Sequence, residues 1–287
     1  MKARLAPHKA ARKHVAPMAQ LWLWLSIAAA LLAIIGNVIA LTVPPIYAVL
    51  KPAFFAQAVA QDVANLVLVS PAWLILAILA LRGSLRAYLL WLGVLTFTVY
   101  NYVIYTLAVP FGSLFPLWVM VFGLALWALI GGLVSADHEA VQTSYENPTA
   151  VKVTAWFLMV VGFLFALLWL SEDLPALLSG RTPQSLLDMG VATNPVHVLD
   201  FAFFLPAIFL TGLWLLRHRP FAFTVAPAFI VFIILTGVPI LLTPVLQAAR
   251  SEAASWGVVI PIGTLTLLML GLLVWLSSTV QPQKRAG

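Results

Sequence analysis

Six polar side chains that could take part in chemistry lie within or at the ends of long apolar runs of this 287-residue chain. They are Asp62, Asn65, Asn101, Tyr105, His197 and Asp200. A carboxylate can hold a cation or a proton, an imidazole can relay protons near neutral pH, and amide or phenol groups can hydrogen-bond a solute. Because ionisable groups inside a bilayer are costly, these residues are the candidate binding site.

Their spacing places them in pairs if the apolar runs are helices. Asp62 and Asn65 are three residues apart, as are His197 and Asp200, so the members of each pair share a helical face. For Asp200 two interpretations stay open, a site for a solute, ion or proton and a hydrogen bond that only joins helices. His197 fits packing, proton relay or metal binding, and Asp62 could be an interfacial carboxylate in contact with water.

Several familiar chemistries are missing from the chain. It contains no cysteine, which leaves imidazole and carboxylate as the strong metal ligands, and His197 and Asp200 are the candidates. No lysine lies within an apolar run to form a retinal Schiff base, and no paired histidines suit haem or copper. Without a phosphate-binding glycine loop or a hydrolase motif, no cofactor is expected. An enzyme would need an unfamiliar site, such as His197 and Asp200 acting as an acid–base pair.

Composition indicates the elements that must position these residues. The chain is 63% hydrophobic and 8% charged, with a mean hydropathy of +1.06, which is typical of a protein embedded in lipid. About 20 apolar residues suffice for one helical crossing. We therefore predict an all-α membrane protein with eight transmembrane helices, near 21–42, 62–81, 87–109, 114–135, 153–171, 196–216, 220–243 and 257–279.

Positive charges predict the orientation. With the N-terminus inside, only Lys51, Arg181 and Arg250 of the 15 lysines and arginines fall on the outer side. This distribution requires an even number of spans, so both termini are predicted to be cytoplasmic. The basic inner face would attract anionic lipid headgroups. No nucleic-acid-binding motif accompanies the basic N-terminal segment, so nucleic acid is not an expected partner.

An internal duplication is visible in two stretches that align without a gap, Asp62–Arg82 and His197–Arg217. Each begins with two polar residues three apart, continues to Pro-Ala, and ends an apolar run with arginine. We predict two parallel repeats of four helices with a polar cavity between helices 2, 3 and 6, open to the outer side. The predicted organisation is a basic segment 1–20, repeat 1 over 21–135, a linker over 136–152, repeat 2 over 153–279 and a basic tail 280–287.

Proline, glycine and asparagine predict the local breaks. Pro71 and Pro206 occupy equivalent positions in the two stretches and should bend helices 2 and 6 alike. The outer segment 172–194 is predicted to carry one or two short interfacial helices, with Gly190 ending one and Asn194 capping the next span.

Two motifs carry a resemblance. Tyr100-Asn101-Tyr102-x-x-Tyr105 and the segment from Asn194 to Asp200, followed by Pro206, resemble a group of uncharacterised bacterial multi-pass membrane proteins. That resemblance implies the bacterial inner membrane and carries over no activity, substrate or catalytic residue. From the residues themselves we expect a transporter, or a protein that binds a small solute, cation or proton. A structural or accessory subunit and a membrane-embedded enzyme are the alternatives, and the oligomeric state is left open.

Overall fold

The computed structural model describes residues 19–281. The predicted basic segment and basic tail therefore lie largely outside the described residues. Within 19–281 the chain is helical, and eight helices are long and apolar enough to cross a membrane. An isolated antiparallel bridge joins Tyr145 to Val280.

The eight spans agree with the predicted number and order. They are α1 (Ala19–Thr42), α2 to α3 (Pro52–Leu81), α4 (Leu85–Ala108), α5 (Phe115–Ser135), α7 (Pro148–Leu178), α9 to α10 (Pro195–Leu216), α11 (Pro220–Ala249) and α12 (Val259–Ser278), which a 3₁₀ turn at Trp256–Val258 precedes. Short helices α6 (His138–Thr143) and α8 (Gln184–Met189) lie outside the spans, and a 3₁₀ turn, η1, covers Pro44–Tyr47.

Three helices extend beyond the predicted limits. The second span begins at Pro52 and not near residue 62, because Pro52 suits a first helical position and the stretch that follows is rich in alanine. The fifth span continues past residue 171 through Pro175 to Leu178, and the seventh continues to Ala249. Glu172 and Asp173, assigned by hydropathy to a loop, are therefore helical.

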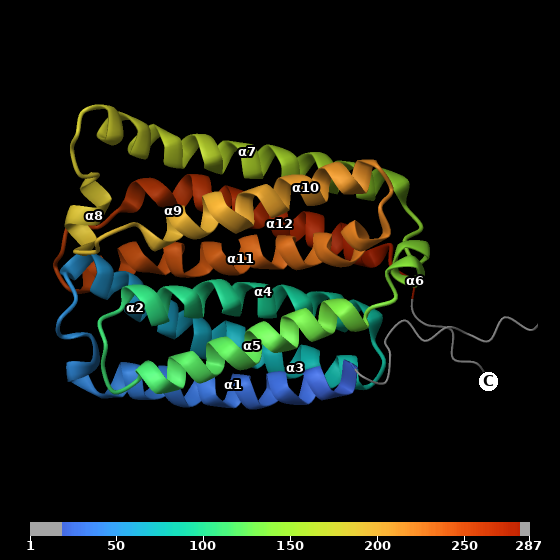
Figure 1. The fold of residues 1–287 in the computed structure, drawn as a ribbon, viewed down its shortest axis with the longest axis horizontal. Helices are drawn as coiled ribbons and strands as arrows, with labels where there is room; N and C mark the ends of the chain where they lie inside the picture. The colour runs from blue at the N-terminus through green and yellow to red at the C-terminus, as the bar shows by residue number, and fades with distance from the viewer. Residues whose placement is uncertain (1–18, 282–287) are drawn as a thin grey trace, which may run out of the picture.

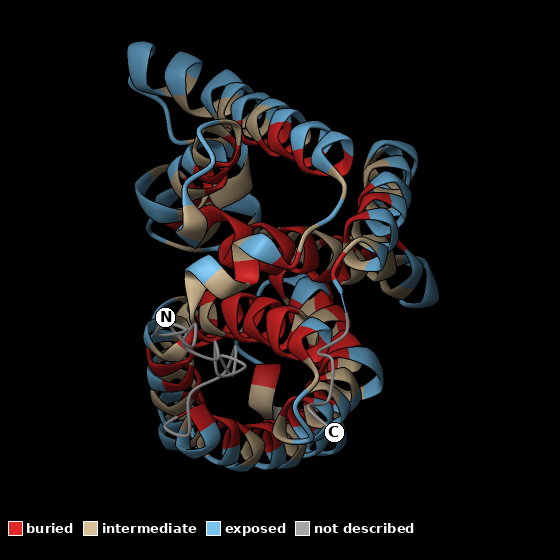
Figure 2. Cartoon of the chain, turned by 90° about the vertical axis from the view of Figure 1, so that its right-hand side faces the viewer, coloured by how far each residue is buried: buried red, intermediate tan, exposed pale blue. Residues whose placement is uncertain are grey.

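The spans form two groups side by side (Figure 1). One group contains α1, α3, α4 and α5, and the other contains α7, α10, α11 and α12; α4 packs on α11 where the groups meet. The connections lie at two ends, which we name the α6 end and the α8 end after their short helices (Figure 1). Figure 2 shows that buried residues line the facing sides of the helices, whereas the topmost helix, α7, is largely exposed.

The two groups meet at small residues. A Cβ atom on Gly93 of α4 would lie 2.9 Å from the carbonyl oxygen of Ala228 on α11 and 2.5 Å from Cβ of Val231. Small residues at such crossings let helix backbones approach closely in a membrane. Extending the ungapped alignment of the two stretches pairs Gly93 with Ala228, so aligned positions contact each other at the crossing.

The same local structures recur at aligned positions of the second and sixth spans. Each contains one π-helical segment, η2 (Asn65–Val69) and η3 (Asp200–Phe204), which begins at the second polar residue of its stretch. Proline follows two residues after each segment; it cannot donate the usual hydrogen bond and so favours a widened turn. Pro71 and Pro206, which the sequence predicts to bend helices 2 and 6 alike, thus each follow a π-helical segment.

The hairpin after each of these spans also recurs. The N–H groups of Arg82, Gly83 and Ser84 donate to the carbonyls of Ile78, Ala80 and Leu79. The N–H groups of Arg217, His218 and Arg219 donate to the aligned carbonyls of Leu213, Leu215 and Trp214. The turn places Gly83 at φ 91° and His218 at φ 52°, a left-handed conformation that glycine adopts without strain.

The α6 end is closed by contacts between distant segments. Arg86 donates to the carbonyl oxygen of Val280 from both Nε (3.0 Å) and Nη2 (2.5 Å). His138 Nδ1 lies 2.8 Å from Oγ1 of Thr224 on α11, and burial lowers the pKa of His138. These contacts attach α6 and the last described residues to the spans.

Candidate functional site

The six predicted residues form two groups and not a single cluster. The first, which we name the Asp62 group, contains Asp62, Asn65, Asn101 and Tyr105 together with Tyr47 and Gln61. The second, the Asp200 group, contains His197 and Asp200 together with Trp169, Asp173 and Tyr100. Within residues 19–281 no hydrogen bond joins a member of one group to a member of the other. The residues predicted to share a cavity between helices 2, 3 and 6 therefore belong to two separate hydrogen-bonded groups.

Asp62 is buried and held by two phenol groups. The residue is only 1% exposed. Its Oδ2 accepts a hydrogen bond from the Tyr47 hydroxyl (2.7 Å), and its Oδ1 accepts one from the Tyr105 hydroxyl (2.6 Å). These short distances are typical of O–H groups that donate to a carboxylate. No cationic side chain in the described part of the chain forms an ion pair with Asp62. Two neutral donors therefore orient the carboxyl group.

Tyr47 reaches Asp62 from outside the helical spans. It ends η1, is 2% exposed, and lies between α1 and α2. Burial, reinforced by Asp62, raises the pKa of Tyr47, so its hydroxyl keeps its proton and acts as a donor. No sequence pattern indicates this role, because Tyr47 is one of several aromatic residues near span ends.

Two buried amide groups keep donors that have no hydrogen-bond partner within residues 19–281. Asn65 Oδ1 accepts from Gln61 Nε2 (3.0 Å) and more weakly from Asn101 Nδ2 (3.4 Å), but buried Nδ2 of Asn65 has no hydrogen-bond partner. Nδ2 of Asn37 on α1 is likewise buried without a hydrogen-bond partner. Because unsatisfied buried donors are costly, they mark positions where a water molecule or a polar ligand would bind favourably.

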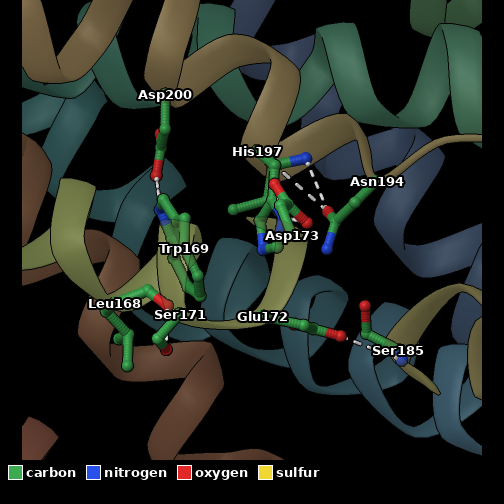
Figure 3. Close-up of polar contacts among 10 residues, drawn as sticks. Leu168, Trp169, Ser171, Glu172, Asp173, Ser185, Asn194, His197 and Asp200 are labelled. Carbon is green, nitrogen blue, oxygen red and sulfur yellow. Dashed lines mark hydrogen bonds and ion pairs between the residues drawn. The ribbon is translucent and has the colours of Figure 1, made fainter. Parts of the chain in front are cut away.

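Asp200 is held by an indole group. It is 7% exposed, and Oδ2 accepts a hydrogen bond from Trp169 Nε1 of α7 (2.8 Å; Figure 3). The Tyr100 hydroxyl also interacts with Asp200. Tyr100 lies on the same helix as Asn101 and Tyr105, so α4 contributes to both groups.

His197 pairs with Asp173, a residue that hydropathy predicts in a loop but that lies in α7. Nδ1 of His197 lies 3.0 Å from each carboxylate oxygen of Asp173 (Figure 3). Asp173 can only accept as a carboxylate, so Nδ1 donates and Nε2 remains available. The His197 side chain is 6% exposed and its ring lies 4.5 Å from the Trp169 ring, whereas the Asp173 side chain is 34% exposed. The pair thus connects the buried imidazole to the surface.

A helix cap and a helix end near His197 determine where the Asp200 group begins along its span. Asn194 caps the sixth span through Oδ1, which accepts from the N–H groups of Val196 and His197 at 3.0 and 3.4 Å, as predicted (Figure 3). Gly190 ends α8 at φ 71°, also as predicted. His197 is therefore in the first turn of its span and Asp200 begins the π segment.

The side chains around His197 and Asp200 add no support for a metal site. Among residues 19–281, no three side chains of histidine, aspartate or glutamate gather closely enough to hold a metal ion. Comparison with protein-family models, curated proteins and solved structures finds no match to this chain.

Proposed function

We propose that this protein is a membrane transporter that binds a small solute together with a proton or cation, and that Asp62 and Asp200 are its ionisable sites. The observation that carries the proposal is the environment of Asp62. Two phenols, and no cationic side chain within residues 19–281, hold this carboxyl group inside a span, one helical turn from the unused amide donor of Asn65. Ionisable residues of this kind in membrane spans mark ion and solute pathways.

The second part of the proposal is a duplicated architecture. Matched π segments, matched hairpins and the contact between Gly93 and Ala228 favour two parallel halves of four spans related by an axis that passes through the crossing of α4 and α11. Transporters built from repeats place their sites near the interface between the halves and move one half against the other. The Asp62 and Asp200 groups flank this interface on either side of α4.

The third part concerns the route of protons. With the N-terminus inside, as the charge distribution favours, the α8 end faces outward in a bacterial inner membrane. Asp173 would then exchange protons with the outer solution and pass them through His197 toward Asp200. Asp62, which lacks a histidine, would exchange through Tyr47 and Tyr105.

The test is transport by purified protein in vesicles loaded with a pH-sensitive dye. Solutes of different charge and size are added in a panel, and proton movement that depends on the solute is recorded. We expect Asp62→Asn and Asp200→Asn each to reduce this coupled flux at least about tenfold, which corresponds to about 1.4 kcal/mol. Asp188→Asn is the matched control, because Asp188 is an exposed carboxylate on α8 whose Oδ1 accepts from Gln184 Nε2.

Two results would contradict the proposal. One is a wild-type protein that moves no member of the panel; the other is coupled flux that persists unchanged in both aspartate variants. Either would favour the alternative in which the polar residues only join helices within a larger assembly.

A further inference from the structure

A cavity of about 250 Å³ lies at the α8 end, between α1, η1, α2 and α11. Apolar side chains form most of its wall, among them Phe55, Val59 and Leu246. Two side chains with polar tips complete it, Tyr47 and Arg250. None of the six residues predicted from the sequence lines this cavity, and it plays no part in the two groups described above except through Tyr47.

Arg250 supplies the charge of the cavity wall. Its guanidinium carbon lies 4.1 Å from the centre of the Phe55 ring, a stacked position that holds the charge over the apolar wall. Nε donates to Glu252 Oε1 (2.8 Å), while neither terminal amino group donates a hydrogen bond to any residue in 19–281. Arginine has five N–H donors, so four remain for a ligand.

Tyr47 supplies a link to the buried carboxyl group. Its ring lines the cavity while its hydroxyl proton is already donated to Asp62. A ligand in the cavity would therefore contact the same tyrosine that orients Asp62.

We infer that this cavity binds a small organic anion, with its carboxylate or phosphate on Arg250 and its apolar body against Phe55, Val59 and Leu246. The terminal amino groups of an arginine suit the two oxygens of such an anion. The small volume of the cavity, about 250 Å³, favours an anion with a short apolar body. If this anion is the transported solute, an assumption that rests on the proposed function, its binding would be coupled to protonation of Asp62 through Tyr47.

The experiment measures binding of radiolabelled hexanoate to the purified chain in a neutral detergent. We expect saturable binding that excess hexanoate displaces and neutral hexanamide does not. Arg250→Gln should weaken binding at least about tenfold, Arg250→Lys should weaken it less, and Leu246→Trp should abolish it by filling the cavity. Arg181→Gln is the matched control, because Arg181 is an exposed arginine at the same end that lies outside the cavity.

A second measurement distinguishes a free acid from a lipid. Native mass spectrometry of the chain with anionic phospholipid would show lipid that is retained by wild type and lost in Arg250→Gln if a headgroup phosphate occupies the site. Hexanoate that displaces this lipid would identify the shared anion site, and hexanoate binding without retained lipid would identify the free acid.

The inference is overturned if wild type binds neither hexanoate nor anionic lipid saturably, or if Arg250→Gln and Leu246→Trp, each checked for a monodisperse elution profile, bind as wild type does. The proposed transport function would survive that outcome, because its test depends on Asp62 and Asp200. Conversely, hexanoate binding with unchanged flux in the aspartate variants would retain the site and remove the transport role.

Discussion

Replacing Gly93 by alanine tests the close approach of α4 and α11. The added Cβ would lie 2.5 Å from Cβ of Val231 and 2.9 Å from the carbonyl oxygen of Ala228. Neither atom moves when a side chain rotates, so the two helices must separate to admit the methyl group. Overpacking of this kind costs about 1–3 kcal/mol, and we expect Gly93→Ala to lower the free energy of unfolding by that amount.

Other glycines of the chain provide matched controls. A Cβ on Gly123 of α5 or Gly271 of α12 would have no neighbour within 4 Å, so alanine there should stabilise by about 0.4–1 kcal/mol through lost backbone entropy in the unfolded chain. At Gly36 the Cβ would meet Cδ2 of Leu117 at 2.6 Å, the end of a side chain that can rotate, so the cost should fall between these cases.

The assay is unfolding of the purified variants in mixed micelles with increasing denaturing detergent, followed by circular dichroism. The expected order of stability is Gly271→Ala and Gly123→Ala above wild type, Gly36→Ala below it, and Gly93→Ala lowest. If Gly93→Ala is as stable as wild type, α4 and α11 do not cross as closely as the structure has them, and the proposed axis between the halves loses its main support.

Three further outcomes follow from individual contacts. Tyr105→Phe removes one of the two donors to Asp62 and should lower the free energy of unfolding by about 1–3 kcal/mol in the same assay; an unchanged midpoint would refute this role. Because burial lowers the pKa of His138 below its usual value of 6.5, the unfolded chain binds that proton more readily, so stability should fall as pH drops through 6.5 and below. His138→Gln should flatten this slope in unfolding curves taken across that range, and an unflattened slope would assign it to other groups. Arg86→Gln removes the hydrogen bonds to Val280 and should make the C-terminal residues more sensitive to carboxypeptidase, with equal digestion as the contradicting result.

Local features of the fold could be predicted because they depend on neighbouring residues. Apolar length gave the eight spans, and the asparagine cap at Asn194 and the left-handed Gly190 formed as expected. Helix ends were less predictable. The fifth span continues through Glu172, Asp173 and Pro175, because a helix in the headgroup region needs hydrogen bonds but not apolar side chains, and hydropathy reports only the latter.

Three partners of the predicted residues, Trp169, Asp173 and Tyr47, could not be predicted, because they come from segments distant in the sequence. Trp169 looked like a member of the interfacial aromatic belt, Asp173 looked like a loop carboxylate, and Tyr47 belonged to a connection between spans. Whether each of these side chains reaches its partner depends on how its segment is rotated and tilted relative to a helix distant in the sequence. Composition and spacing carry no information on these angles.

The position of α4 explains why the six residues separate into two groups. Asn101 and Tyr105 are four residues apart and share one face, which contacts Asn65 and Asp62. Tyr100 precedes Asn101 by about 100° around the helix and faces Asp200 instead. Of the eight spans in residues 19–281, α4 is the most deeply buried, and it packs against helices of both groups of spans. α4 therefore contacts both carboxyl groups, each from a different face, although no hydrogen bond joins the two carboxyl groups within residues 19–281.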